Sequence, residues 1–301
     1  MKSQIYGETA ASQIAKKAIA QRLLKAYGDV GQRYLPEDKA LGRFKVQLAF
    51  RDDRLQLRLD CTGAALHKRG YRQLAGPAPL RETLAASFLS LMRFKPFSDE
   101  LLWDPCCGSG TIAIEAAMIA ANMAPGLRRR FACEVFPFFS TKAIVEARNR
   151  AKQELDLEAP EQPFIFASDI DPELLDLASE NAKKFGLENF IRFFRSDFCR
   201  PYDSVPRILD QAERCLIISN PPYGLRISDQ RSVRELHYAF RKRCFNSDGL
   251  KPSYRLGLIT SSKDLEEDLA QPADKRRKLY NGMIEACFYQ WFKHPRVARN
   301  A

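Results

Sequence analysis

Residues 101–111 read LLWDPCCGSGT, and this stretch decides the fold. A short apolar run ends at Asp104, a loop of small residues follows, and the chain from Thr111 to Met123 is apolar nearly all round, as in a buried helix. A strand, loop and helix joined in this way bring the backbone close to a ligand, because glycine has no side chain and a helix N-terminus offers free N–H groups. The stretch therefore predicts a ligand-binding turn at the carboxyl end of a sheet strand.

The composition of this loop indicates which ligand it holds. It matches neither G-x-G-x-x-G nor G-x-x-x-x-G-K-[ST], the two glycine patterns that bind pyrophosphate groups. The acidic Asp104 at its head suits a positively charged ligand better, and S-adenosylmethionine (SAM) carries both an ammonium and a sulfonium group. A tight structural turn without a ligand is the alternative. The residues expected to contact the cofactor here are Asp104, Cys106, Gly108, Ser109, Gly110 and Thr111.

Around this turn, helices and strands alternate from about residue 77 onward. Short apolar runs predict strands at residues 101–103, 164–167, 191–194, 215–218 and 256–259, and longer segments predict helices at residues 80–92, 111–123 and from Pro172 to Gly186. Repeated β-α units predict an α/β fold with a doubly wound, mostly parallel sheet. An antiparallel hairpin with its turn at Asn281-Gly282 is expected to close the sheet near the C-terminal end of the chain.

The front of the chain has a different pattern. Residues 10–27 predict an amphipathic helix, and residues 44–50 and 55–60 alternate apolar and polar side chains as the two strands of a hairpin. A helix and two strands are too little to close a core of their own. We therefore expect part of a domain over residues 1–65, a linker over residues 66–76 and the main domain over residues 77–301.

Acidic residues follow two further predicted strands. Asp169 ends the second strand of the main domain, where a carboxylate in such folds accepts hydrogen bonds from ribose hydroxyls. Asp171 is interpreted as the N-cap of the next helix, with Pro172 at the first helical position. Asp197 ends the third strand and is expected to accept a hydrogen bond from the adenine amino group of the cofactor, unless it is only a turn residue.

The sharpest chemical signal is the stretch SNPPYG at residues 219–224, which follows an apolar strand. An exocyclic amine on a base is a poor nucleophile, because its lone pair is delocalised into the ring. Two acceptors, the side-chain oxygen of Asn220 and the backbone oxygen of Pro221, would favour the pyramidal amine with its lone pair free. Pro221 and Pro222 stiffen the loop so that these acceptors are preorganised, and Tyr223 can stack on the base. Asn220, Pro221, Pro222 and Tyr223 are therefore the predicted catalytic residues.

Composition narrows the class of protein. The 301 residues carry a formal net charge of +11, which favours a polyanionic partner such as nucleic acid. No apolar run is long enough to span a bilayer, and the start of the chain lacks a signal-peptide core, so a cytoplasmic location is expected. Eight cysteines without C-x-x-C spacing and three scattered histidines predict reduced thiols and no metal site. No feature indicates an oligomeric state.

Taken together, these motifs resemble the THUMP-associated class I SAM-dependent RNA methyltransferases, which modify the N2 amino group of guanine in rRNA or tRNA. The bacterial branch that acts on large-subunit rRNA is the most similar. The resemblance implies a Rossmann-like sheet, SAM contacts from the glycine loop, Asp169, Asp197, Asn220 and the region of Thr83, and contacts with the target amine from Asn220 to Tyr223. The matching stretches are residues 66–72, 78–85, 104–111, 122–127, 169–172, 220–224 and 278–282.

The sequence departs from the family at two places. Only the last helix and hairpin of a THUMP domain are recognisable, so we expect a chain truncated at its N-terminus, which puts RNA affinity in question. Cys106 stands where relatives often have an aromatic residue, and little effect is expected because the backbone faces the cofactor.

Three other functions compete with this interpretation. An N6-adenine methyltransferase on RNA or DNA would use the same chemistry at Asn220, but the stretches at residues 66–72 and 122–127 favour the guanine branch. An NAD-dependent dehydrogenase is disfavoured by the loop pattern and by the long interval between Asp104 and Asp169. A non-catalytic RNA-binding module is disfavoured by the intact stretch at residues 220–223.

Overall fold

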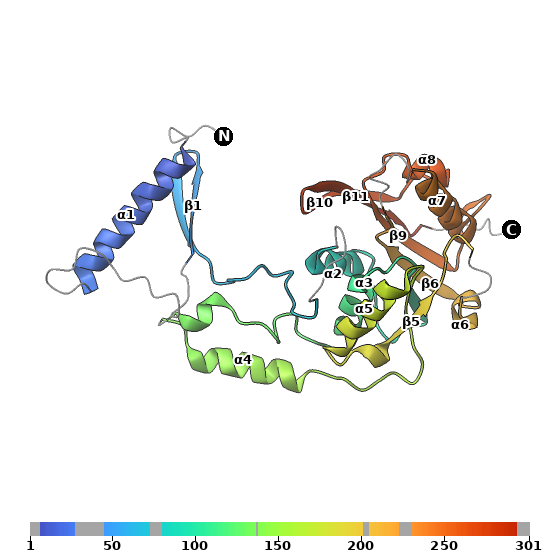
Figure 1. The fold of residues 1–301 in the computed structure, drawn as a ribbon, viewed down its shortest axis with the longest axis horizontal. Coiled ribbons are helices and arrows are strands. Elements are labelled where there is room, and N and C mark those ends of the chain that lie inside the picture. Colours follow the sequence, from blue (N-terminus) through green and yellow to red (C-terminus); the bar gives the residue numbers. More distant parts are fainter. Residues whose placement is uncertain are drawn as a thin grey trace, which may run out of the picture. The chain divides into compact units, whose positions relative to one another are not determined.

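The structure, a computed structural model, describes residues 7–27, 45–72, 80–136, 138–200, 205–222 and 230–293. The chain forms two compact units (Figure 1). The first unit comprises Met1–Leu66 and Arg129–Arg148, and the second unit comprises His67–Arg128 and Asn149–Ala301. Within the described ranges, no helix has both the length and the apolar character needed to cross a membrane.

The first unit contains the front helix and hairpin that the sequence predicts. They are α1 (Glu8–Tyr27), β1 (Val46–Arg51) and β2 (Arg54–Leu59), and the two strands are antiparallel. Asp52 and Asp53 both have positive φ angles, of 50° and 56°, which is the backbone of a two-residue hairpin turn. The hairpin that the sequence predicts is therefore present.

The first unit also includes residues from between the first two strands of the main sheet. This segment holds η2 (Ala132–Val135) and most of α4 (Thr141–Gln153). The Arg129 side chain donates hydrogen bonds to the carbonyl oxygens of Ala65 (2.9 Å) and Thr62 (3.1 Å). Residues 129–148 thus pack beside the end of the front hairpin, although they lie inside the predicted main domain; the division at residues 65 and 77 stays a prediction.

The second unit is built on a seven-stranded sheet in the order β10-β11-β9-β6-β3-β4-β5. Five strands are parallel, whereas β11 runs antiparallel to both of its neighbours. This arrangement confirms the doubly wound α/β fold and the closing hairpin. The strands are β3 (Glu100–Asp104), β4 (Ile165–Asp169), β5 (Ile191–Arg195), β6 (Arg214–Ser219), β9 (Tyr254–Thr260), β10 (Lys275–Asn281) and β11 (Ile284–Trp291).

Helices cover both faces of this sheet (Figure 1). On one face lie α2 (Glu82–Leu91), α3 (Thr111–Ala120) and α5 (Pro172–Lys183), and on the other lie α7 (Gln230–Cys244) and α8 (Leu265–Leu269). The predicted helix at residues 111–123 ends earlier, because Asn122 has the left-handed φ of 47°. The shorter elements are η3 (Glu188–Phe190), α6 (Arg207–Asp210), β7 (Phe245–Asn246) and β8 (Gly249–Leu250).

Alternation along the strands divides the core into two apolar clusters. In β3, Leu102 belongs to the cluster with α2, α3 and α5, whereas Trp103 belongs to the cluster with α7 and α8. Both side chains are fully buried, and the Trp103 indole donates a hydrogen bond to the Ser168 hydroxyl (3.1 Å). Strands of a parallel sheet are buried on both faces, which explains why their sequences read as continuous apolar runs.

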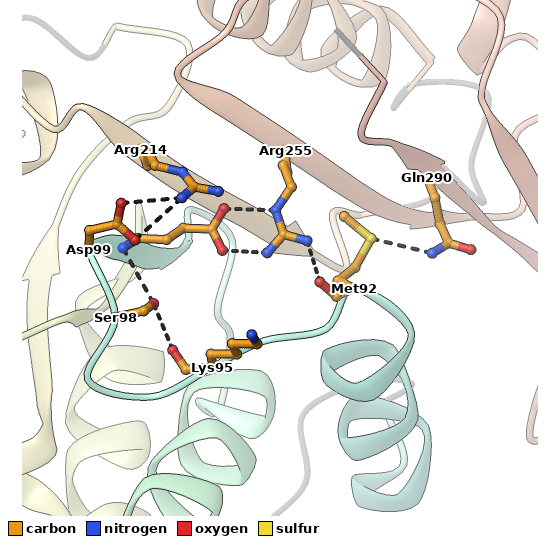
Figure 2. Close-up of polar contacts among 8 residues, drawn as sticks. Met92, Lys95, Ser98, Asp99, Arg214, Arg255 and Gln290 are labelled. Carbon is orange, nitrogen blue, oxygen red and sulfur yellow. Dashed lines mark hydrogen bonds and ion pairs between the residues drawn. The ribbon is translucent and has the colours of Figure 1, made fainter.

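Ion pairs hold the starts of three strands together at the amino edge of the sheet (Figure 2). The Arg255 guanidinium, near the start of β9, binds both carboxylate oxygens of Glu100, with one nitrogen–oxygen distance of 2.7 Å, and also donates to the carbonyl oxygen of Met92. Arg214, at the start of β6, pairs with Asp99 at 3.2 Å. Glu100 is buried, while the Arg214–Asp99 pair is exposed.

Candidate active site

The strand order sets the position of the site at the opposite, carboxyl edge. The first strand of the second unit, β3, lies between β4 on one side and β6 on the other. Connections leave β3 and β6 toward different parts of the sheet, and such a switch point opens a crevice outside the carboxyl ends of the strands. The loop after β3 and the stretch from Asn220 after β6 therefore start side by side, since Trp103 and Ile217 are paired across the two strands.

Asp104 joins these two loops by a direct hydrogen bond. It is buried, and its Oδ1 accepts from the Ser219 hydroxyl at 2.7 Å and from the Cys106 backbone N–H at 3.3 Å. Burial raises the pKa of Asp104 to about 7, and the negative charge of Asp169 adds to the shift. A cation bound close to this carboxyl would favour its charged form.

The glycine loop has the backbone of a ligand cradle. Gly108 and Gly110 have left-handed φ angles of 52° and 80°. A Cβ on Gly110 would lie 2.9 Å from the Cβ of Ala178 on α5, so a side chain there would force the helix away. A Cβ on Gly108 would meet nothing within 4 Å, which means that the loop faces open space at this point. Ser109, between them, is half-buried, and its carbonyl oxygen accepts from the Asn181 amide at 3.4 Å.

Asp169 holds the same loop from the end of β4. Its Oδ2 accepts a hydrogen bond from the Gly108 N–H at 2.8 Å, and its Oδ1 accepts from the Asp171 N–H at 3.1 Å. Each carboxylate oxygen can accept a second bond, and Asp169 is half-buried, so it retains capacity for a ligand hydroxyl. Asp171 accepts from the Glu173 N–H at 2.9 Å and has Pro172 beside it, which confirms it as the N-cap of α5.

Asp197 lies beyond the end of β5 in a turn. Its Oδ1 accepts from the Cys199 N–H at 2.9 Å, and its carbonyl oxygen accepts from the Arg200 N–H at 2.9 Å. These bonds describe a turn residue, and the half-buried carboxylate keeps a second oxygen for a ligand, so its predicted contact with adenine stays a prediction. Burial and the carboxylates of Asp104 and Asp169 raise the pKa of the Cys106 thiol, which keeps it neutral.

The predicted catalytic stretch begins where β6 ends. Asn220 is half-buried, Pro221 is buried and Pro222 is exposed. Tyr223 lies outside the described residues. The fold thus brings Asn220 to the same sheet edge as the glycine loop, while the roles of the two predicted acceptors stay predictions.

Two buried ion pairs were not anticipated from the sequence. Arg72 lies 3.6 Å from the Glu82 carboxylate, and it donates to the carbonyl oxygen of Leu80 (3.0 Å) and to the Thr111 hydroxyl. Arg72 therefore connects the start of α2, where the half-buried Thr83 lies, with the start of α3. The second oxygen of Glu82 is buried with no hydrogen-bond partner among the described residues, so it is available to a donor from a ligand.

The second pair anchors the predicted linker. Arg69 binds the buried Glu115 of α3 at 3.2 Å, and the hydroxyl of the fully buried Tyr71 donates to the same carboxylate at 3.3 Å. Residues 69–72 are thus packed into the second unit. Charged residues usually indicate solvated faces, so the sequence carried no signal for either pair.

Comparison with protein families and known proteins gives a consistent result. A family model described as the RMKL-like methyltransferase domain matches residues 69–290. The "Putative RNA methyltransferase YpsC" of Bacillus subtilis (strain 168) is 34% identical over 299 residues, which cover 99% of this chain and 73% of that protein. The "Ribosomal RNA large subunit methyltransferase K/L" of Vibrio parahaemolyticus is 36% identical over 252 residues, which cover 80% of this chain but only 33% of that protein. The chain therefore spans about a third of the length of the second relative.

Solved structures show the same fold. SMU.472, "a putative methyltransferase complexed with SAH", matches with a TM-score of 0.79 at 32% identity, covering 97% of this chain and 72% of that one. A protein of Listeria monocytogenes (str. 4b F2365), named a "predicted N6-adenine-specific DNA methylase", also matches with a TM-score of 0.79, at 33% identity over 97% of this chain and 71% of that one.

Proposed function

The chain belongs to the family of RMKL-like methyltransferase domains, and from this premise we propose that it methylates the exocyclic N2 amine of a guanine in RNA. We favour a nucleotide of large-subunit rRNA as the target, with tRNA as the second candidate. Two observations support RNA as the substrate class. The names of the two relatives refer to RNA or ribosomal RNA, and the net charge of +11 favours a polyphosphate partner.

The methyl donor is SAM. SMU.472 was crystallised with SAH, which is SAM after loss of its methyl group. When bound, SAM supplies an electrophilic methyl group on its sulfonium. The residues present fit this cofactor, because open space lies beside Gly108 and acidic residues, Asp104 and Asp169, flank the loop on two strands. Asp169 would hold the ribose hydroxyls, and Asp104 would balance the positive charge.

Asn220 is the residue that we assign to the chemistry of the target amine. Its side-chain oxygen accepts a hydrogen bond from one N–H of the amine, and the Pro221 carbonyl oxygen accepts a hydrogen bond from the other. The two bonds favour the pyramidal amine, whose lone pair can then attack a methyl group. Transfer would break the bond between that methyl group and the sulfonium sulfur, and the methylated nitrogen would release one proton to solvent. Because the loop is stiffened by two prolines, the acceptors need little rearrangement when charge develops on the amine.

The observation that carries this proposal is the hydrogen bond between Asp104 and Ser219. It ties the cofactor loop after β3 to the residue directly before Asn220. A methyl donor and a methyl acceptor must meet within contact distance for transfer to occur. This bond fixes the two loops that would hold them at one place on the sheet edge.

Two measurements test the proposal. Calorimetry of the purified chain should detect SAM binding and no binding of NAD. Mass spectrometry of nucleosides from rRNA and tRNA of a strain that lacks the gene should show loss of an N2-methylguanosine, restored by the parent gene and not by Asn220→Ala. If every N2-methylguanosine is retained in that strain, the guanine assignment is wrong.

An N6-adenine methyltransferase is the second candidate. It is favoured by the name of the Listeria neighbour, and the same pair of acceptors would serve an adenine amine. The same nucleoside measurement discriminates the two, because this candidate predicts loss of N6-methyladenine from DNA or RNA with N2-methylguanosine unchanged.

A further inference from the structure

A groove runs along α7 on the second unit. It is a cavity of about 680 Å³. Its walls come from the segment after β5 (residues 198–200), from α7, and from the segment that leads into β9 (residues 251–254). We call it the α7 groove.

The lining of the α7 groove is strongly basic. Arg200, Arg234 and Lys242 are exposed cations in its walls, whereas Arg243 lies over the ring of Trp103 and is held by the core. Of the described residues that line the groove, Glu235 alone is acidic, and its carboxylate pairs with Arg231 at 3.2 Å. The net field in the groove therefore attracts an anionic ligand.

An exposed aromatic ring stands among these cations. Tyr238 is 62% exposed, and it lines both the α7 groove and a second cavity of about 610 Å³. Arg234, Tyr238, Arg241 and Lys242 follow one another at helical spacing, so they share the outer face of α7. An exposed ring between arginines is a suitable surface for stacking a nucleobase while the arginines bind phosphates.

The groove starts beside the proposed active site. Cys199, in its wall, donates its backbone N–H to Asp197, the residue expected to contact adenine. Burial and the nearby carboxylates raise the pKa of the Cys106 thiol in the glycine loop, and the neighbouring Cys199 adds to the shift. A strand of nucleic acid whose target base lies at Asn220 therefore has an electropositive path onward along α7.

We propose that the α7 groove binds a single-stranded segment of the RNA that flanks the target base. This inference rests on the proposed function for the identity of the polyanion. Two features favour a single strand: the stacking surface at Tyr238 requires an unpaired base, and the cations follow one helix face rather than a broad plane. An acidic protein segment would use the cations but not the ring.

The test compares two triple variants of the whole chain that remove the same charge. The first, called the α7 variant, is Arg200→Ala/Arg234→Ala/Lys242→Ala, which removes the three exposed cations of the α7 groove. The control is Lys95→Ala/Lys183→Ala/Arg192→Ala at exposed positions elsewhere on the second unit. The probe is a fluorescent oligouridine of about 12 nucleotides, a length within the usual site size for single strands. The α7 variant should bind it about 10-fold more weakly or worse, with a salt slope reduced by about 2, since each lost phosphate contact lowers that slope by about 0.7. The control should bind like the parent.

A second pair of variants tests the ring. Tyr238→Ala should weaken oligouridine binding by about 5-fold or more, whereas Tyr238→Phe retains the ring and should bind like the parent.

Equal losses in the α7 and control triples, an unchanged α7 triple, or tighter binding of duplex RNA by the parent would each overturn the proposal. Loss of polyglutamate binding with unchanged oligouridine binding would assign the groove to an acidic protein instead. SAM calorimetry on every variant separates the two levels: no SAM binding by the parent contradicts the proposed function, while normal SAM binding with unchanged RNA affinity contradicts only the groove.

Discussion

Strand β3 begins at Glu100 and ends at Asp104, and these two buried carboxylates have very different surroundings. At the amino edge, Glu100 is bound through both oxygens by the guanidinium of Arg255. At the carboxyl edge, the partners of Asp104 are neutral donors, the Ser219 hydroxyl and the Cys106 N–H, and burial raises its pKa to about 7.

The two carboxylates differ in role along a single strand: the one at the amino edge serves stability, and the one at the carboxyl edge serves function. The charge of a buried carboxylate that is fully paired inside the protein is already balanced, so a ligand adds little to its stabilisation. The negative charge of the Asp104 carboxylate is compensated only in part by its neutral donors. A cationic ligand beside it would stabilise the charged carboxylate, and this interaction would contribute to the free energy of binding. The amino edge should therefore respond to mutation through stability, and the carboxyl edge through binding and turnover.

The largest effect on stability is expected at the amino edge. Arg255→Ala removes the guanidinium and leaves the Glu100 carboxylate buried and uncompensated, which should lower the free energy of unfolding by about 3 kcal/mol. Urea unfolding measures the loss. The matched control is Arg214→Ala, which breaks the exposed pair with Asp99 at the same edge and should cost less than about 1 kcal/mol. Equal losses in the two variants would contradict the distinction between the buried and the exposed ion pair.

Asn220→Ala tests the chemistry at the carboxyl edge. Loss of one preorganised acceptor should lower kcat by about 10²–10³, with a much smaller change in KM, because the bond strengthens in the transition state. Single-turnover rates on substrate RNA, read beside the melting temperature, give the result. Asn220→Asp keeps an acceptor and should retain part of the activity. A variant that melts early but turns over at the parental rate would remove Asn220 from the chemistry.

Asp169→Ala tests the cofactor anchor at the same edge. Loss of hydrogen bonds to a charged acceptor should weaken SAM binding by about 1–3 kcal/mol in calorimetry. Asp171→Ala, two residues away, is the control, because it removes only the N-cap of α5 and should cost about 1 kcal/mol of stability with SAM affinity unchanged. An unaltered dissociation constant in a folded Asp169→Ala protein would exclude the assignment.

The smallest effect concerns the pH dependence of stability. The folded protein holds a proton on Asp104 up to about pH 7, whereas the unfolded chain releases it near pH 4. The stability that this proton contributes is present at low pH and is lost as pH rises through 7, so that unfolding at pH 8 should cost about 1.4 kcal/mol less than at pH 6. In Asp104→Asn this contribution disappears. The test is the difference between the two pH profiles, and profiles that run parallel would show that Asp104 does not titrate between pH 6 and pH 8.

Local chemistry made much of this molecule predictable. Asp104 and Asp169 end apolar runs, and Asp171-Pro172 has the cap and first-turn pattern of a helix, so the strands and α5 could be placed from sequence. The closing hairpin was also predicted, but its turn lies at Gly282-Met283, one residue later than expected, because Asn281 still pairs with Ile284 as the last residue of β10. Helix α7 was missed, although Val233, Leu236 and Phe240 lie at helical spacing and are buried; basic residues around them masked the pattern.

Contacts between residues that are far apart along the chain could not be predicted from the sequence. Nothing in residues 129–148 shows that Arg129 hydrogen-bonds with Ala65, since the two positions are far apart along the chain. The Ser219 hydroxyl and the Arg72–Glu82 pair were missed for the same reason, because their partners lie on other elements. Such contacts depend on how strands and helices pack, which no local pattern records.

The placement of Trp103 has a practical consequence for spectroscopy. The chain has two tryptophans, Trp103 and Trp291, and both are buried in the second unit. Intrinsic tryptophan fluorescence therefore does not report the unfolding of the first unit. A melting curve followed by emission reports only the sheet that carries the proposed active site, whereas circular dichroism also detects α1. If the two probes give different midpoints, the two units unfold separately, and a single melting temperature would describe neither.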